Sequence, residues 1–137
     1  MGLIFDTSLL IAAERGTLDI NGLIKGKEEE LFGISVITVS ELLHGVYRAD
    51  TEKRRLKIEA YAESIIEVFP IYYFDTSAAR IYARVWSSLA SKGIQAGSHD
   101  LIIASTAISL GFSVATFDKR DYAKIEGLKL ELLKSNS

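Results

Sequence analysis

The most informative stretch of the sequence is Gly97-Ser98-His99-Asp100-Leu101-Ile102-Ile103-Ala104-Ser105-Thr106-Ala107. Ser98 is a favourable N-cap, which predicts that Asp100 lies in the first helical turn, where free N–H groups and the helix dipole favour a negative charge. The residues after Asp100 leave almost no polar face as far as Leu110, and a helix that is apolar nearly all round is a buried one. The sequence therefore predicts a buried helix with one carboxylate at its mouth. That carboxylate is either a capping device or part of a site.

Short apolar strands alternate with helices on either side of this stretch. We expect strands at residues 3–5, 31–37, 71–74, 112–116 and 128–133, and helices at about 9–14, 17–25, 39–49, 52–67, 76–91 and 98–110. This alternation predicts βαβ units, and so an α/β fold whose mainly parallel central sheet has helices on both faces. Nothing in the sequence indicates a linker. Residues 1–137 are therefore expected to form a single domain, with a frayed tail at about 134–137.

The composition is that of an ordinary globular chain, with 48% hydrophobic and 25% charged residues. A formal net charge of −2 argues against a basic footprint for nucleic acid over the whole surface, but not against a local basic patch or a bound cation. The absence of Cys from the sequence excludes a disulfide framework, a thiolate zinc site and a cysteine nucleophile. The apolar runs are too short to span a membrane and the chain starts without a signal peptide, so we expect a cytoplasmic protein with no membrane partner.

Acidic residues stand at the points where strands pass into helices. Asp6 follows the first strand and Glu41 the second, Asp118 follows the fourth, and Asp100 opens the helix before that strand. In a parallel sheet the carboxyl ends of the strands meet at one edge, where ligands bind. Carboxylates gathered there repel one another unless a cation neutralises them, and donors that are all oxygen suit Mg²⁺ or Mn²⁺. Such an ion promotes phosphodiester cleavage, because it activates water and offsets the charge that develops on the phosphate.

Each of these acids also has a purely structural interpretation. Asp6 and Asp100 can serve the first turns of their helices. Glu41 completes a capping box with Thr38, and Asp118 is of a type common in turns. Spacing alone leaves both interpretations open for every acid, and the joint placement at one sheet edge favours a site.

A short repeat offers an internal control. Phe5-Asp6-Thr7-Ser8 and Phe74-Asp75-Thr76-Ser77 both lie where a strand passes into a helix. Four residues are too few to indicate a duplication, and Asp-Thr-Ser is simply a favourable start for a helix. The two aspartates therefore need not share a role, because an aspartate that caps a helix need not be catalytic.

Four segments in order, residues 4–8, 34–45, 98–104 and 114–122, resemble the PIN-domain family and, within it, the VapC-type toxin nucleases of toxin–antitoxin pairs. Glu-Leu-Leu-x-Gly at 41–45 and Asp-Leu-x-Ile-Ala at 100–104 are the more specific motifs. The resemblance implies a PIN-like three-layer α/β/α sandwich and an endoribonuclease that depends on Mg²⁺ or Mn²⁺. It also implies a catalytic quartet of Asp6, Glu41, Asp100 and Asp118, in which Asp6 and Asp100 are the direct metal ligands. Asp75 matches a helix-capping aspartate outside the site.

The same resemblance implies RNA as the substrate, a homodimer, and a small antitoxin whose tail enters the acidic crevice, with a basic side chain in place of the cation. His99 and Phe117 depart from the usual pattern at positions that bear on substrate contacts more than on cleavage. The Tyr and Trp residues lie at core spacing and are interpreted as packing residues. Two alternatives are an aspartyl phosphatase or receiver domain, although Ser8 stands where such phosphatases need a second Asp, and a catalytically silent PIN module that binds RNA or protein.

Overall fold

The computed structural model describes residues 2–25 and 29–132. Its strands are β1 (Gly2–Phe5), β2 (Leu31–Ser35), β3 (Ile71–Tyr72), β4 (Ser113–Thr116) and β5 (Lys129–Leu132). They form one sheet in the order β3-β2-β1-β4-β5, and every neighbouring pair is parallel. The predicted α/β fold with a parallel sheet is therefore confirmed, although β3 is two residues long where four were predicted. The predicted frayed tail lies outside the described residues.

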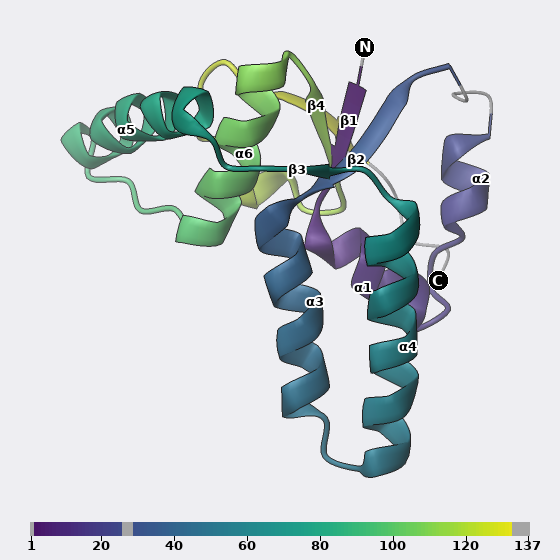
Figure 1. The fold of residues 1–137 in the computed structure, drawn as a ribbon. Coiled ribbons are helices and arrows are strands. Elements are labelled where there is room, and N and C mark those ends of the chain that lie inside the picture. The colour runs from purple at the N-terminus through teal and green to yellow at the C-terminus, as the bar shows by residue number, and fades with distance from the viewer. Residues whose placement is uncertain (1, 26–28, 133–137) are drawn as a thin grey trace.

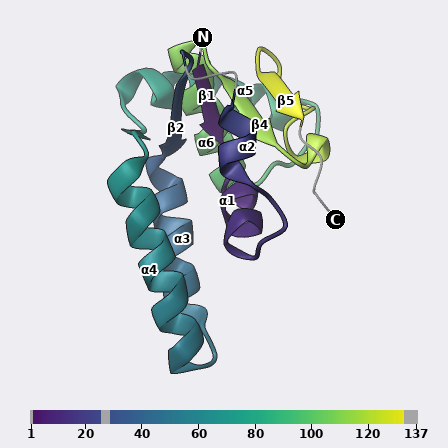
Figure 2. The same ribbon diagram turned by 90° about the vertical axis from the view of Figure 1, so that its right-hand side faces the viewer.

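Helices cover both faces of this sheet and bury two separate cores (Figures 1 and 2). One face carries α1 (Thr7–Glu14), α2 (Ile20–Ile24) and α4 (Glu52–Val68), and the other carries α5 (Thr76–Ser91) and α6 (Ser98–Leu110). The central strand β1 supplies both cores, because successive side chains of a strand point to opposite faces. Leu3 and Phe5 pack on the side of α1 and α4, and Ile4 packs on the side of α5 and α6.

A helical hairpin projects beyond the carboxyl ends of the strands (Figure 1). Helix α3 (Val36–Arg48) leaves β2 at that edge, and α4 returns antiparallel to it. Two contacts tie the hairpin to α1: Arg54 pairs with the Glu14 carboxylate through both terminal nitrogens, and the Tyr61 hydroxyl donates to the Leu10 carbonyl at 2.7 Å. The hairpin is therefore fixed against the helix that begins directly after Asp6.

The junction of β2 and α3 differs from the prediction. The strand was expected to continue to residue 37 and Thr38 to cap the helix, but β2 ends at Ser35 and α3 begins at Val36. Ser35 is the N-cap, because its hydroxyl accepts the N–H of Ile37 at 3.2 Å. Val36 and Ile37 favour a strand by propensity, and the earlier side-chain cap overrides that preference.

The ends of α6 match the prediction more closely. Gly97 rather than Ser98 is the N-cap, and Asp100 still lies in the first turn. Gly111 ends the helix in the left-handed conformation, with φ of 72°, which glycine adopts without steric cost. Helix α1 starts at Thr7, two residues earlier than expected. These shifts leave every predicted acid in its predicted element.

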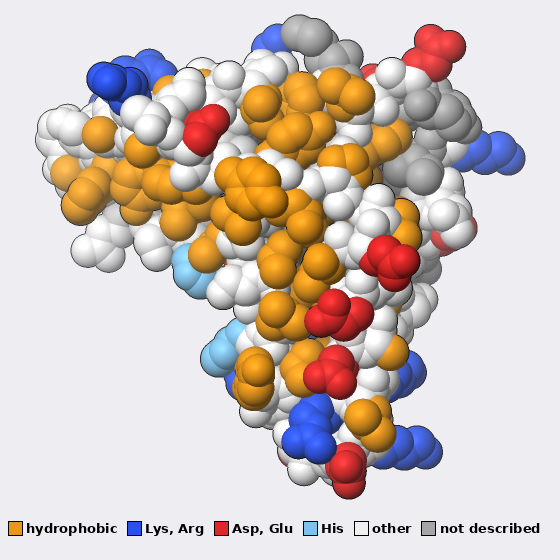
Figure 3. Space-filling view, viewed as in Figure 1, with side chains coloured by type: hydrophobic (Ala, Val, Ile, Leu, Met, Phe, Trp, Pro, Cys, Tyr) orange, Lys and Arg blue, Asp and Glu red, His pale blue; other side chains and the backbone are white. Residues whose placement is uncertain are grey.

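Hydrophobic side chains gather on the surface over α5 and the β3 edge of the sheet (Figure 3). Tyr73 and Trp86 are 70% and 60% exposed. The rings of Phe74, Tyr82 and Trp86 follow one another edge to face, with centroids 5.6 and 5.9 Å apart. An apolar patch of this kind is typical of a protein contact surface. Within the described part of the chain, no helix is both long and apolar enough to cross a membrane.

Candidate functional site

Asp6 lies at the centre of the carboxyl edge of the sheet. Its N–H donates to the carbonyl of Ala115 on β4 at 2.9 Å, and Asp6 as a whole is 6% exposed. Three hydroxyls donate to its carboxylate: Ser8 at 2.7 Å and Thr116 at 3.0 Å to Oδ2, and Tyr122 at 2.9 Å to Oδ1. These hydrogen bonds compensate for the burial of a charged group and hold its rotamer.

The internal control separates Asp6 from Asp75. Asp75 caps α5, because its Oδ1 accepts the N–H of Ala78 at 2.9 Å. Asp6 occupies the same position before α1, yet its side chain makes no capping hydrogen bond. The capping interpretation of Asp6 is therefore wrong, and its carboxylate is turned toward other side chains.

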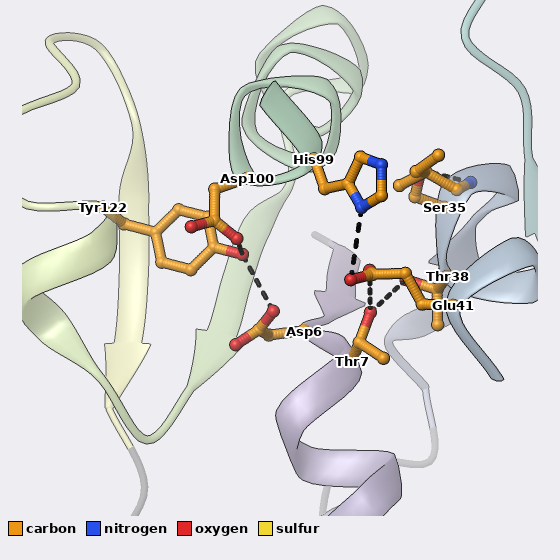
Figure 4. A network of polar contacts seen from close by, with 9 residues as sticks. Asp6, Thr7, Ser35, Thr38, Glu41, His99, Asp100 and Tyr122 are labelled. Carbon is orange, nitrogen blue, oxygen red and sulfur yellow. Dashed lines mark hydrogen bonds and ion pairs between the residues drawn. The ribbon is translucent and has the colours of Figure 1, made fainter. Parts of the chain in front are cut away.

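Asp100 faces Asp6 across the hydroxyl of Tyr122 (Figure 4). That hydroxyl lies 3.5 Å from Oδ1 of Asp100. Burial raises the pKa of Asp100 to about 6, and the charges of Asp6, Asp121 and Glu41 add to the effect in that order. Burial and the two facing carboxylates also raise the pKa of Tyr122 far above its usual value, so this phenol stays protonated. Negative charge is thus concentrated around Asp100.

Glu41 belongs to a second group of side chains beside this pair. Its Oε1 accepts the hydroxyl of Thr7 at 2.6 Å, and its Oε2 lies 3.4 Å from Nδ1 of His99 (Figure 4). The hydroxyls of Thr7 and Thr38 are 2.9 Å apart, and since Thr7 donates its proton to Glu41, Thr38 is the donor in that contact. Glu41 therefore forms no capping box with Thr38, whose helix begins earlier, and its carboxylate is held toward α1 and α6.

The structure places the fourth predicted acid differently. The Asp118 side chain accepts the N–H of Arg120 at 2.9 Å and pairs with its guanidinium at 3.3 Å, which lowers the pKa of Asp118. It begins the 3₁₀ turn η1 (Lys119–Asp121), as its structural interpretation predicted. Asp121, at the end of that turn, is the acid from this segment that raises the pKa of Asp100. Asp118 itself reaches the site only through its N–H, which donates to the Thr116 hydroxyl at 3.1 Å.

The site is therefore a pair of carboxylates with neighbours, not a preformed cage. Asp6 and Asp100 share a hydroxyl, while Glu41 and Asp121 act on Asp100 through their charge. No three acidic or histidine side chains of residues 2–25 and 29–132 come close enough to make a ready metal-binding group. The donors that converge here are oxygen atoms, which is the set that Mg²⁺ and Mn²⁺ prefer.

Tyr122 belongs to the site, although its sequence position predicts a packing residue of the core. Its ring does lie in the core, because the residue is 1% exposed and packs among the residues under α5 and α6. The hydroxyl points out of that core into the carboxylate pair. Its place directly after Asp121, in the last segment of the family motif, was the signal that could have marked it.

Comparison with known proteins identifies the family to which this chain belongs. A model of the PIN domain matches residues 3–128. The chain is 38% identical to ribonuclease VapC1 of Rickettsia felis over 133 residues, and the matched region covers 95% of each protein. It is 34% identical to the tRNA(fMet)-specific endonuclease VapC of Salmonella typhimurium over 98 residues, and that region covers 72% of each protein. The solved structure of DNA-bound VapBC from Salmonella typhimurium aligns with a TM-score of 0.84 and 28% identity, over 96% of this chain and 97% of that one.

The chain belongs to the PIN-domain family, among the VapC ribonucleases. The five parallel strands with helices on both faces match the three-layer sandwich that the sequence resemblance implied.

Proposed function

We propose that this chain is a metal-dependent endoribonuclease and the toxin of a VapBC-type toxin–antitoxin pair. The observation that carries the proposal is the pair of carboxylates at the carboxyl edge of the sheet, where Asp6 and Asp100 face the same hydroxyl in a chain related to VapC ribonucleases. In agreement with that geometry, the charges of Asp6, Asp121 and Glu41 raise the pKa of Asp100. A fold keeps such repulsion where a cation or a cationic group offsets it. Since RNA is the substrate of this activity, the proposal includes a cytoplasmic location.

The side chains at this edge fit a divalent cation. Asp6 and Asp100 would hold it directly, because their carboxylates face each other across one hydroxyl. Glu41 would act partly through water, and the family resemblance implies the same outer role for Asp118. Asp121 is a further candidate for that outer role because of its effect on Asp100. When bound, Mg²⁺ or Mn²⁺ supplies Lewis-acid chemistry: it lowers the pKa of water and offsets charge on the phosphate.

The contribution of the chain itself is orientation. Ser8 and Thr116 fix one oxygen of Asp6, and Thr7 fixes Glu41. Water then attacks phosphorus in line and the bond to the 3′ oxygen breaks, which leaves a 5′-phosphate and a 3′-hydroxyl. The RNA 2′-hydroxyl takes no part, so 2′,3′-cyclic phosphate ends would contradict the mechanism.

The test compares RNA ends after brief induction of the wild-type chain, Asp6→Asn, Asp100→Asn and Asp75→Asn. Asp75→Asn is the matched control, because Phe precedes and Thr-Ser follow both aspartates and asparagine still caps a helix. We expect cleavage by the wild type and the control and none by Asp6→Asn or Asp100→Asn, with EDTA abolishing activity of the purified chain. Purified tRNA(fMet) is the first defined substrate, because a relative is named for it. Full activity of either site variant, or activity in EDTA, would refute the metal site. A chain that binds Mn²⁺ in a calorimeter but cuts no RNA would be the silent module instead.

A groove beside the site suits the antitoxin tail. It runs between α1 and the α3–α4 hairpin, and its lining includes Ile11, Arg15, Glu41, Leu42, Arg48 and Ile58. Glu41 belongs both to this groove and to the acidic site, so a bound segment would lead its basic side chain to the carboxylates. We expect Ile11→Glu to lose the co-purifying antitoxin while cleavage persists. Leu56→Glu, an exposed apolar residue of α4 that does not line the groove, is the control.

The proposed homodimer has a candidate surface in the apolar patch over α5 and β3. Tyr73 and Trp86 expose more apolar area there than a solvated surface favours. Trp86→Glu is expected to shift the molar mass measured by light scattering from dimer to monomer. A wild-type chain that is monomeric at micromolar concentration would contradict the homodimer.

A further inference from the structure

The tyrosine at the centre of the site is more than a core residue. The Tyr122 side chain fills the core with its ring, and its single hydroxyl proton faces two carboxylates, 2.9 Å from Oδ1 of Asp6 and 3.5 Å from Oδ1 of Asp100 (Figure 4). A phenylalanine would fill the same core space. The hydroxyl therefore serves the carboxylates and not the packing.

The other donors to Asp6 act differently. Ser8 and Thr116 both donate to Oδ2 of Asp6, whereas the hydroxyl of Tyr122 lies between Asp6 and Asp100. A carboxylate has about four lone-pair positions, so the hydroxyls of Ser8 and Thr116 occupy Oδ2 and the hydroxyl of Tyr122 takes one position on Oδ1. The remaining lone-pair position of Oδ1 is available to a cation, and Tyr122 orients the oxygen that carries it. Tyr122 is therefore the contact that sets Asp6 relative to Asp100.

We propose that Tyr122 is a positioning residue, whose hydroxyl holds the Asp6 and Asp100 carboxylates in the relative arrangement that receives a divalent cation. This inference rests on the proposed function, since it takes those two aspartates as the metal ligands. The hydroxyl would not bind the metal itself but would donate a hydrogen bond to side chains that do. Loss of such a hydrogen bond weakens metal affinity about 10- to 100-fold.

The experiment measures Mn²⁺ binding by isothermal titration calorimetry in the absence of RNA, for the wild-type chain and Tyr122→Phe. Tyr61→Phe is the matched control: it also removes a tyrosine hydroxyl with a 2.7 Å hydrogen bond, but the acceptor is the carbonyl of Leu10 and not a carboxylate of the site. We expect the Kd for Mn²⁺ to rise about 10- to 100-fold in Tyr122→Phe and to stay unchanged in Tyr61→Phe. The Mn²⁺ concentration for half-maximal RNA cleavage should rise by the same factor.

Each other result overturns the inference. If Tyr122→Phe lowers the unfolding temperature but binds Mn²⁺ as tightly as the wild type, the hydroxyl is only structural. If it binds Mn²⁺ more tightly, the hydroxyl competes with the ion for Asp6. In both cases a wild-type chain that binds Mn²⁺ and cuts RNA leaves the proposed function intact. A wild-type chain that takes up no Mn²⁺ and cuts RNA in EDTA removes the proposed function and this inference together.

Discussion

Replacing Asp100 by Asn should stabilise the metal-free protein while removing its activity. Burial raises the pKa of Asp100 to about 6, and the charges of Asp6, Asp121 and Glu41 contribute to that rise. The folded protein therefore binds this proton more tightly than the unfolded chain does. An ionised Asp100 destabilises the fold, and an asparagine of the same shape carries no charge to repel.

The size of the effect follows from the pKa. A rise from 3.8 to about 6 corresponds to roughly 3 kcal/mol of differential interaction, and because Asp100 is only half-buried, solvent screening reduces this to about 1–2 kcal/mol. Between those two pH values the folded state holds more protons than the unfolded state. The free energy of unfolding that depends on Asp100 therefore falls as pH rises from about 4 to 6 and then stays constant. Asp100→Asn should match the wild type near pH 4 and exceed it by about 1–2 kcal/mol at pH 7.5.

The assay is urea denaturation in EDTA, at equal protein concentration and at several pH values between 4 and 7.5. The quantity of interest is the difference in free energy of unfolding between Asp100→Asn and the wild type. A difference that does not change with pH, or a wild type more stable than the variant at pH 7.5, would refute the electrostatic reasoning. Repeating the series with Mn²⁺ should reverse the order, because a ligand that binds only the folded wild type stabilises it by mass action.

Three further predictions concern Asp121, Gly33 and Asp75. Asp121→Asn should lower the pKa of Asp100, measured by carboxyl ¹³C titration, whereas Asp118→Asn should leave it unchanged; equal shifts would contradict the charge assignment. Gly33→Ala should lower the free energy of unfolding by about 1–3 kcal/mol in the same urea assay, because the new Cβ would lie 2.2 Å from the Tyr72 ring and 2.8 Å from the carbonyl oxygen of Pro70; an unchanged free energy of unfolding would contradict this clash. Asp75→Ala should cost about 1 kcal/mol of stability with no loss of RNA cleavage, and inactivity of the folded variant would place that aspartate in the site.

The sheet and its acidic edge were predictable because both follow from local patterns. The first strand is apolar at every position, which indicates a parallel strand covered on both faces, and Leu3, Ile4 and Phe5 are all buried. In a parallel sheet the carboxyl ends of all strands lie at the same edge, so Asp6 and the start of α3 had to be close. The place of Asp100 followed in the same way from a helix that opens directly before a strand. The placement of the acids also favoured a divalent cation and phosphodiester cleavage, whereas RNA as the substrate and the partners came from the resemblance.

The details that set the chemistry lie beyond such patterns. Asp118 and Asp121 stand three residues apart in one charged loop, and only the 3₁₀ turn decides which of them acts on Asp100. The hydroxyl of Tyr122 contacts a carboxylate 116 residues away, and nothing in the local sequence says that a core tyrosine turns its polar end toward an acid. The start of α3 was missed because Ser35 captures an N–H inside a run that favours a strand.

The long sequence separation between Asp6 and two of its hydrogen-bond donors also affects when the site can form during synthesis. Thr116 follows Asp6 by 110 residues, and translation at about 5–20 residues per second takes roughly 5 to 20 s to cover that distance. Throughout this interval the nascent chain holds Asp6 without the β4 strand and the tyrosine that orient it. A chain still growing on the ribosome therefore lacks the complete acidic site until the segment that carries Thr116 and Tyr122 has been made.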